Sequence, residues 1–325
     1  MGMLVSQEIA TAVLDSWDLL AGQELQSSTT WLTGGMGDLM SASSGKIIQG
    51  GSEYILLVPT DLEEAGEQCV NASFNALGAT NVAQGKATLV VSEELNAIDP
   101  ARWYLIRGAL AMVLRPNSPD YHYVITATGS EVKELKEGKG PDTEDPDGFQ
   151  LKGSIAWYAL NKIGIDRVRL KSDQLGMTNA QVSEMVNRIA GHLPLLAATA
   201  LAGGFADVGY DGLSTFNTGH YVDPRNKKGS QDNTLALKLN PDNFYAARAR
   251  LRSFKARDQQ AFGRSALPFL MLMINENPEP LMIGPGCESY ENTKRVEYGL
   301  TVRWAVRLCR WWQAVTSKGP SRGQE

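Results

Sequence analysis

An aspartate and a histidine in one glycine-rich stretch are the residues best placed to do chemistry in this 325-residue chain. Asp211 and His220 lie in Gly209–Val222, and His220 is one of only three histidines. Such a pair could act as general acid and base or as metal ligands, but either role needs a third group that orients the imidazole. The sequence shows no such group, so we expect a structural loop in which hydrogen bonds satisfy His220.

The other histidines and the cysteines also have plain structural interpretations. His122 is predicted on a strand and His192 on a helix, where a solvated or packed imidazole is usual. The cysteines lie far apart and match no metal-ligand spacing, which indicates free thiols in a reducing compartment; they are Cys69, Cys287 and Cys309. We therefore expect no catalytic residue, no metal site and no cofactor.

Three stretches resemble ligand-binding loops and depart from them at the residues that matter. Met40–Lys46 is similar to a phosphate loop, but Met40 replaces the first glycine and Ile47 stands where a magnesium-binding Ser or Thr belongs. Gly34–Gly37 lacks the third glycine of a dinucleotide loop. Asp142–Gly148 resembles a calcium loop, but Gly153 occupies the place of the closing glutamate. None of them predicts a ligand.

Composition excludes some classes of protein. The 31 Lys and Arg against 36 Asp and Glu argue against a dedicated binder of nucleic acid or anionic lipid. No stretch reaches the roughly 20 apolar residues that span a bilayer, and no secretory signal is visible. The glycosylation pattern Asn71–Ser73 then has no consequence, and we expect the chain to stay in the cytoplasm where it is made.

Periodicity predicts the elements of the first third of the chain. Residues 4–20 carry apolar side chains at helical spacing, and residues 23–51 suit an extended arm. A strand at 54–58 is followed by Thr60 and Glu63, which form a capping-box signal for a helix through about Phe74. A strand at 87–91 and an apolar segment at 103–114 complete what we interpret as a compact α/β module.

The rest of the chain alternates long periodic segments with one acidic loop. Residues 129–148 hold seven acids and three lysines, so we expect a solvated tip between strands at 121–126 and 155–160. Helices are predicted at 179–201, bent at Pro194, and from Asn240-Pro241 to Phe254. Alternation predicts a half-buried strand over 300–308. The tail at 318–325 is predicted to be disordered.

At this point the residues suggest a family. The spacing of Tyr210-Asp211-Gly212, Phe216 and His220 resembles the hallmark of the Mu-like phage major head subunits, where this loop follows a long helix and a Gly-Phe turn, here Gly204-Phe205. Further blocks are similar to the same family; they are 58–64, 89–92, 173–177, 239–244, 267–269 and 312–314. Together these blocks are spread over more than half of the chain.

The resemblance implies an α+β fold of the Hong Kong 97 capsid type. Its parts would be an N-terminal arm, 1–50; an axial-type α/β module, 51–115; an extended loop, 120–170; the spine helix with peripheral and axial segments, 171–265; peripheral-domain strands, 266–317; and the tail, 318–325. Thr215 and Tyr221 depart from the family pattern. The block at 54–105 would be expected at about 265–267, so either this module has been relocated in the gene or its alignment is wrong.

The function implied by the resemblance is that of a major capsid protein, which assembles an icosahedral shell around a phage genome in the bacterial host cytoplasm and stays in the virion. Its partners would be its own copies in hexamers and pentamers, with scaffold, portal or decoration proteins. It would enclose DNA without sequence-specific binding and contact no membrane. Two alternatives stay open, an encapsulin-like compartment and an α/β enzyme that uses Asp211 and His220.

Overall fold

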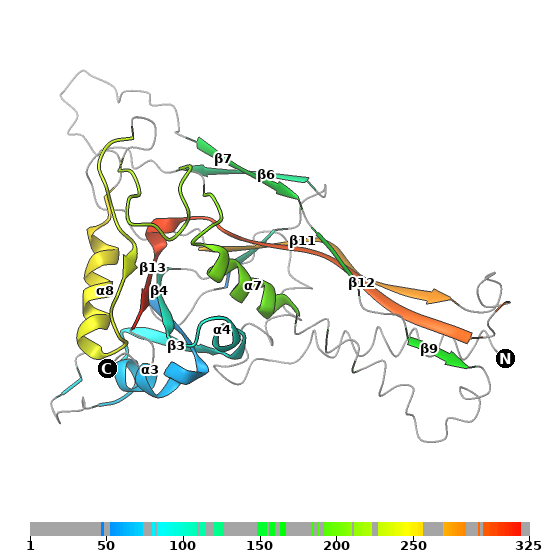
Figure 1. Cartoon of the computed structure of the whole chain (residues 1–325), viewed down its shortest axis with the longest axis horizontal. Helices are drawn as coiled ribbons and strands as arrows, with labels where there is room; N and C mark the ends of the chain where they lie inside the picture. The colour runs from blue at the N-terminus through cyan, green and yellow to red at the C-terminus, as the bar shows by residue number, and fades with distance from the viewer. Residues whose placement is uncertain are drawn as a thin grey trace, which may run out of the picture.

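The computed structural model of the chain combines two mixed sheets, a separate two-stranded ladder and several helices (Figure 1), which confirms the α+β class. The predicted helix at 4–20, the arm at 1–50 apart from 47–48, Cys287 and most of the acidic tip lie outside the described residues. The structure describes residues 47–48, 53–73, 80–81, 83–108, 111–114, 120–126, 148–154, 156–159, 163–166, 184, 188, 192–209, 211–222, 227–255, 269–283, 292 and 295–319.

A five-stranded sheet forms the centre of the body. Its order is β10-β13-β4-β2-β3, in which β2 and β3 are parallel and β4 is antiparallel to both of its neighbours. Every residue of β2 is buried, as expected for an apolar strand with both faces covered. The strands are β2 Tyr54–Pro59, β3 Ala87–Ser92, β4 Arg102–Arg107, β10 Thr234–Leu235 and β13 Ala314–Lys318.

The strands predicted in the α/β module, at 54–58, at 87–91 and within 103–114, are present, with corrections to the elements around them. A 3-10 turn, η2 Thr60–Leu62, precedes α3 Glu63–Val70, and no side chain caps either element, so the capping-box prediction is wrong and the helix ends before Phe74. By contrast, the Leu95 amide donates to the Ser92 hydroxyl at 3.3 Å and caps α4 Glu93–Ile98. β5 Ala111–Leu114, expected in this module, pairs in the other sheet.

α8 Pro241–Ser253 covers one face of the central sheet and confirms the predicted helix. The Asn240 side chain accepts from the Asn243 amide at 2.8 Å, and Pro241 occupies the first turn, where a missing N–H costs little. The side chains of α8 that share its buried face join one apolar cluster with Trp103, Trp311 and Trp312; they are Phe244, Ala247 and Leu251. This spacing of three and four residues is what the sequence pattern indicated.

The second sheet has the order β1-β5-β11-β12-β8, with β9 also on β12, and its long ladder extends away from the body (Figure 1). β12 contains the predicted strand 300–308 and is longer than expected. The β11–β12 register shifts between Ile274 and Glu279, around Pro278, which cannot donate to a ladder. The strands are β1 Ile47–Ile48, β8 Ala156–Ala159, β9 Ile163–Asp166, β11 Leu270–Ile283 and β12 Arg295–Leu308.

A two-stranded ladder flanks the acidic segment, as expected, but its second strand differs from the prediction. β6 Asp120–Thr126 pairs with β7 Gly148–Ser154, from Asp120 opposite Ser154 to Thr126 opposite Gly148. The predicted partner, 155–160, instead supplies β8, which pairs with β12. The segment that forms β8 is thus part of the sheet that contains β11 and β12.

The described part of the predicted helix at 179–201 is its C-terminal end. α7 His192–Gly203 is helical with Pro194 near its start, and it contacts β12 and α4. Glu184 and Arg188 are also helical and form an ion pair at 3.2 Å. The rest of that helix lies outside the described residues, so its full length stays a prediction.

Candidate functional site

The glycine-rich loop begins where α7 ends, at a close approach of backbone to side chains. The Phe216 amide donates to the Gly204 carbonyl at 2.8 Å, and a Cβ at Gly204 would lie 2.7 Å from Leu308 Cδ1 and 2.8 Å from Phe216 Cδ2. The Phe216 ring also packs on Phe205 and Tyr104, at centroid distances of 5.1 and 5.5 Å. The glycine therefore lets the loop turn directly against the body.

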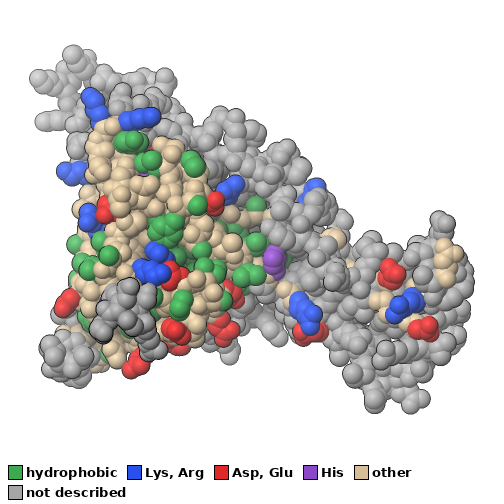
Figure 2. Space-filling model, viewed as in Figure 1, with side chains coloured by type: hydrophobic (Ala, Val, Ile, Leu, Met, Phe, Trp, Pro, Cys, Tyr) green, Lys and Arg blue, Asp and Glu red, His purple; other side chains and the backbone are tan. Residues whose placement is uncertain are grey.

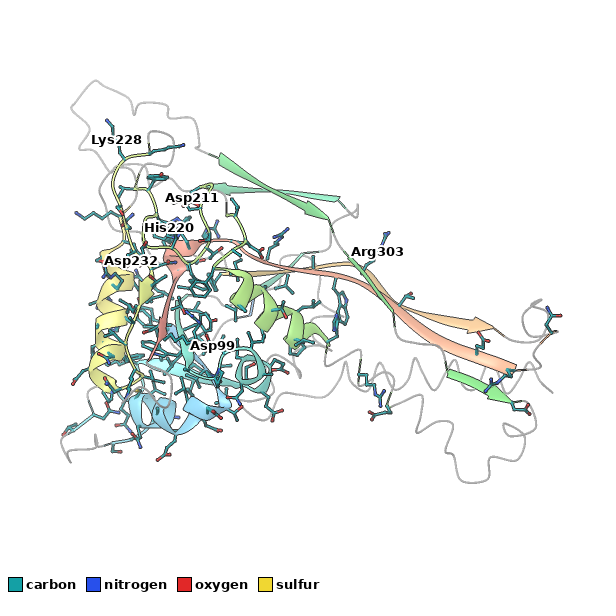
Figure 3. All side chains as sticks on the ribbon, in the orientation of Figure 1. Asp99, Asp211, His220, Lys228, Asp232 and Arg303 are labelled. Atoms are coloured by element: carbon teal, nitrogen blue, oxygen red, sulfur yellow. The ribbon has the colours of Figure 1, made fainter. Side chains whose placement is uncertain are left out.

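Asp211 and His220 form a buried pair in this loop (Figure 3). His220 Nδ1 lies 2.8 Å from Asp211 Oδ2, and the side chains are 0% and 1% exposed respectively. The other ring nitrogen, Nε2, lies 3.1 Å from the Thr215 carbonyl oxygen. The third group that the sequence did not reveal is Trp311, whose ring stacks on the imidazole at 4.1 Å with 3° between the planes.

Both ring nitrogens of His220 face hydrogen-bond acceptors. A carbonyl oxygen can only accept, so Nε2 donates to Thr215. Nδ1 faces Asp211 Oδ2, and the other carboxylate oxygen accepts the Leu213 amide at 3.2 Å. The carboxylate at the edge of the ring and the stacked face of Trp311 together fix the orientation of the imidazole.

Asn233 holds the loop to the segment that carries Trp311. Its side-chain nitrogen donates to the carbonyls of Thr215, at 2.8 Å, and Trp311, at 3.0 Å, while its oxygen accepts the Asn217 amide at 2.9 Å. Asn233 is fully buried. All three bonds go to backbone groups, so this amide joins three segments of chain that are distant in sequence.

Arg310 lies beside the same segment and is 2% exposed. Its guanidinium carbon lies 5.8 Å from the centre of the Trp312 ring. Trp311, Asn233 and Arg310 were not predicted from the sequence. For Trp311 one signal was available, the adjacent pair Trp311-Trp312, since two neighbouring indoles predict a buried anchor.

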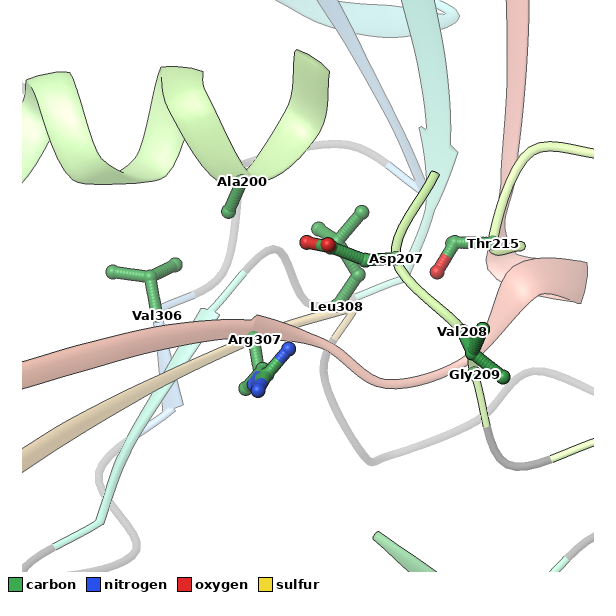
Figure 4. A pocket seen from close by; sticks show the side chains of 8 residues that line it. All are labelled: Ala200, Asp207, Val208, Gly209, Thr215, Val306, Arg307 and Leu308. Atoms are coloured by element: carbon green, nitrogen blue, oxygen red, sulfur yellow. The ribbon is translucent and has the colours of Figure 1, made fainter. Parts of the chain in front are cut away.

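This burial decides what the pair can do. With both side chains shielded from solvent, no substrate reaches either group, so the arrangement can hold the loop but cannot transfer protons to a bound molecule. A hollow that opens to solvent lies between the end of α7, the start of the glycine-rich loop and β12 (Figure 4). Its lining contains one acid and one base but neither Asp211 nor His220; it consists of Ala200, Asp207, Val208, Gly209, Thr215, Val306, Arg307 and Leu308.

The remaining histidines lie where the sequence placed them. His122 is in β6, opposite Lys152. His192 begins α7 and stacks on Trp304, with centroids 6.5 Å apart, and burial lowers the pKa of its imidazole. Both therefore belong to elements other than the loop that carries the Asp211–His220 pair.

Cys69 and Cys309 are buried free thiols, and burial raises the pKa of each to about 12. In the described parts of the chain, no three His, Cys, Asp or Glu side chains gather closely enough to hold a metal ion. Likewise, none of the described helices has the length and apolar character needed to cross a membrane. The phosphate-loop and dinucleotide-loop candidates at 34–47 lie outside the described residues, apart from Ile47.

One charged cluster lies where β4 begins and β13 ends, at one end of these two neighbouring strands of the central sheet. The Asp99 carboxylate pairs with Arg102 Nε and with Lys318 Nζ, both at 3.1 Å, and so joins β4 to β13. Burial favours the protonated carboxyl, but the hydrogen bonds and charges of Lys318 and Arg102 outweigh it and hold the pKa of Asp99 below its ordinary value. This cluster is structural, since each partner lies at an end of a strand.

Comparison with known proteins identifies the class to which this loop is related. Residues 158–246 match the family model of the Mu-like prophage major head subunit gpT, and the match contains α7, the Asp211–His220 pair and Asn233. This confirms the resemblance to phage major head subunits suggested by the loop residues. No curated protein matches the chain.

Among solved structures, similar chains come from phage-like particles. The bacteriophage JBD30 capsid is 14% identical with a TM-score of 0.48, and the match covers 64% of this chain and 62% of that chain. The JBD30 procapsid is 17% identical with a TM-score of 0.43, covering 66% and 68%. The capsid of the native GTA particle is 10% identical with a TM-score of 0.38, covering 65% and 89%. The match thus spans less than two thirds of the JBD30 capsid chain.

Proposed function

We propose that this chain is a major capsid protein that assembles, as copies of itself, into an icosahedral shell enclosing a phage genome. The observation that carries the proposal is the family match over 158–246, which contains the buried pair Asp211–His220. The same pair carries the resemblance at the level of sequence. A pair that anchors a loop without solvent access suits a building element of a shell.

The extended elements support a role in assembly. The β11–β12 ladder reaches well beyond the body (Figure 1), and β6 and β7 pair only with each other among the described strands. A two-stranded ladder is marginally stable alone in water. Burial against a neighbouring subunit would stabilise it by about 25 cal/mol per Å² of apolar surface. Many modest contacts of this kind, repeated by symmetry, suffice for a closed shell.

The domain arrangement proposed is that of a Hong Kong 97 type subunit, with residues 51–115 as the axial-type module. The Gly108 amide donates to the Glu53 carbonyl at 2.9 Å, so the two ends of this module adjoin. A segment whose ends adjoin can be moved in a gene without breaking the fold around it. This contact favours a relocated module over a wrong alignment of 54–105.

The two other candidate functions are tested by the same preparation. An enzyme that uses Asp211 and His220 would need them exposed to substrate, and they are buried. A compartment for host enzymes would form the same shell with a different content. Negative-stain electron microscopy of the purified protein should show closed particles of uniform size. A monodisperse monomer that never forms particles would overturn the proposal, and protein cargo in place of nuclease-protected DNA would favour the compartment.

A further inference from the structure

Acidic side chains without ion-pair partners gather at one end of the body. This acidic surface lies on η2, α3 and the start of α4, and the Asp61 amide donates to the Asn96 side chain at 3.0 Å, which joins these elements. Among the described residues its members form no ion pair, and residues 54–85 contain no Lys or Arg. The members are Asp61, Glu63, Glu64, Glu67, Glu93 and Glu94.

A group of basic side chains without ion-pair partners lies at the other end, while one further such cation, Lys86, follows the segment that carries α3. Four exposed cations, which we call the basic surface, form no ion pair within the described chain; they are Lys227, Lys228, Arg250 and Lys255. Their neighbour Arg252 is different, because it donates to the Tyr54 hydroxyl at 2.9 Å and lies 3.7 Å from Glu53 Oε2. Glu53, the acid next to Arg252, is therefore already engaged in an ion pair.

α8 separates the two surfaces. At its N-terminal side, Lys238 lies against Gly319, next to the Lys318–Asp99 ion pair, whereas at its C-terminal side Phe254 packs on Trp311 at 5.2 Å. A 13-residue helix is about 20 Å long, and charges in physiological salt are screened over about 8 Å. Figure 2 shows acidic side chains along the lower edge and Lys or Arg side chains at the upper end, and Figure 3 places Lys228 near the top of the body and Asp99 in its lower part.

We propose that the acidic surface of one subunit docks on the basic surface of a second copy of this chain. The proposal rests on the proposed self-assembly and names the surfaces that meet. The charges cannot neutralise one another within one subunit, but a head-to-tail arrangement brings opposite signs together. Such a contact joins two different surfaces and closes into a ring when the rotation between subunits permits. Ile98, the last residue of α4, is 40% exposed beside the acidic surface and offers an apolar side chain to such a contact.

Charge reversal tests this directly in the full-length protein. Glu63→Lys with Glu67→Lys reverses one face of α3, and Arg250→Glu with Lys255→Glu reverses the basic surface. Each pair of substitutions alone should raise the protein concentration needed for particle assembly by on the order of tenfold. Combining all four restores opposite signs across the contact, so assembly should return to within about threefold of the wild-type concentration. Light scattering and negative-stain images measure the loss of assembly in each pair of substitutions and its recovery in the combined variant.

Matched controls separate the surfaces from general charge effects. Glu184→Lys with Arg188→Glu exchanges an exposed ion pair elsewhere and should leave assembly unchanged. Glu63→Gln with Glu67→Gln gives a milder change if a reversal variant does not fold, and should weaken assembly in the same direction. Circular dichroism checks folding in each case.

The outcomes are distinct from those that test the proposed function. If wild-type protein forms shells but the fourfold variant assembles no better than either parent, the docking inference is wrong while the capsid function stands. The inference also fails if the basic-surface variant assembles normally and encloses less DNA, because that surface would then face nucleic acid. Only a recovery of particle assembly in the variant with all four substitutions supports the docking contact.

Discussion

The imidazole of His220 lies flat on the indole of Trp311, 4.1 Å away and only 3° from parallel. Asp211 binds the edge of the same imidazole, so the ring is held between a carboxyl group and an aromatic face. The contact joins the glycine-rich loop to the η3 turn, Trp311–Gln313. The residues that resemble a phage hallmark therefore act as an anchor for a loop.

Removing the aromatic platform should destabilise the subunit. Trp311 is 3% exposed and also packs on Phe254 and Trp312, so Trp311→Ala leaves a large cavity and should lower the free energy of unfolding by about 3–5 kcal/mol. Trp311→Phe keeps an aromatic face, so its free energy of unfolding should fall by less. Urea unfolding of unassembled subunits measures the stability of both variants. A Trp311→Ala variant as stable as wild type would contradict the anchoring role.

The buried pair should show strong coupling. Asp211→Ala leaves Nδ1 of the buried His220 without its hydrogen-bond partner, and a loss of about 1–3 kcal/mol in unfolding free energy is expected. His220→Ala leaves a buried carboxylate and should be similarly costly. The double variant should lose less than the sum of the two, by about 1–3 kcal/mol, in a double-mutant cycle. Simple additivity would mean that the two groups do not interact.

The close approach at the end of α7 should not tolerate a methyl group. Gly204→Ala would place a Cβ within 3 Å of Leu308 and of the Phe216 ring, which is itself held by other aromatic rings. We expect a loss of about 1–3 kcal/mol in the free energy of unfolding. Thr199→Ala, at an exposed position of the same helix, is the matched control and should change stability by less than about 0.5 kcal/mol. Equal effects of the two substitutions would rule out the proposed steric cause.

Alkaline pH should weaken the fold through the buried thiols. Burial raises the pKa of Cys69 and Cys309 from 9.0 to about 12, so the native state keeps both protons where the unfolded state has lost them. Their contribution to stability is complete below pH 9.0 and is lost as pH rises toward 12. Denaturant unfolding at a series of pH values measures the slope.

The control for that slope is a double variant, Cys69→Ala with Cys309→Ala. It should decline less steeply between pH 9 and pH 12 than the wild-type protein, because only the other groups still titrate. Identical slopes would exclude the thiols. Thiol reagents at pH 8 should also modify Cys69 and Cys309 only after unfolding, since these two native thiols are protonated and buried.

Local patterns predicted the elements that have a clear period or a cap. α8 combines an asparagine cap, a proline in the first turn and an apolar face, and β12 alternates over many residues, so both were evident from the sequence. β7 was misplaced because the apolar segment at 155–160 looks equally like a strand, and only the long sheet decides its partner. Local pattern did not predict β11, and only the resemblance placed strands within 266–317. Pro278 and Pro280 disfavour a strand, but the register shifts on both sides of Glu276 interrupt the regular ladder next to Pro278.

The residues of the site also divide into those that a local pattern predicts and those that only the tertiary fold brings together. Asp211 and His220 could be recognised as a pair because they lie in one loop. Trp311 and Asn233 could not, since the sequence carries no signal of the fold that brings them to that loop. The charged surfaces were hidden for a similar reason, because α8 and α3 adjoin only in three dimensions.

The order of strands in the central sheet also bears on synthesis at the ribosome. β13 lies between β4 and β10, and the Thr316 hydroxyl bonds to the Trp103 carbonyl across 213 residues of sequence. Contacts of such long range form slowly and cannot form before both segments have been translated. A nascent chain that ends before residue 314 therefore has an open sheet edge at β4, which chaperones would need to shield until translation delivers the missing strand.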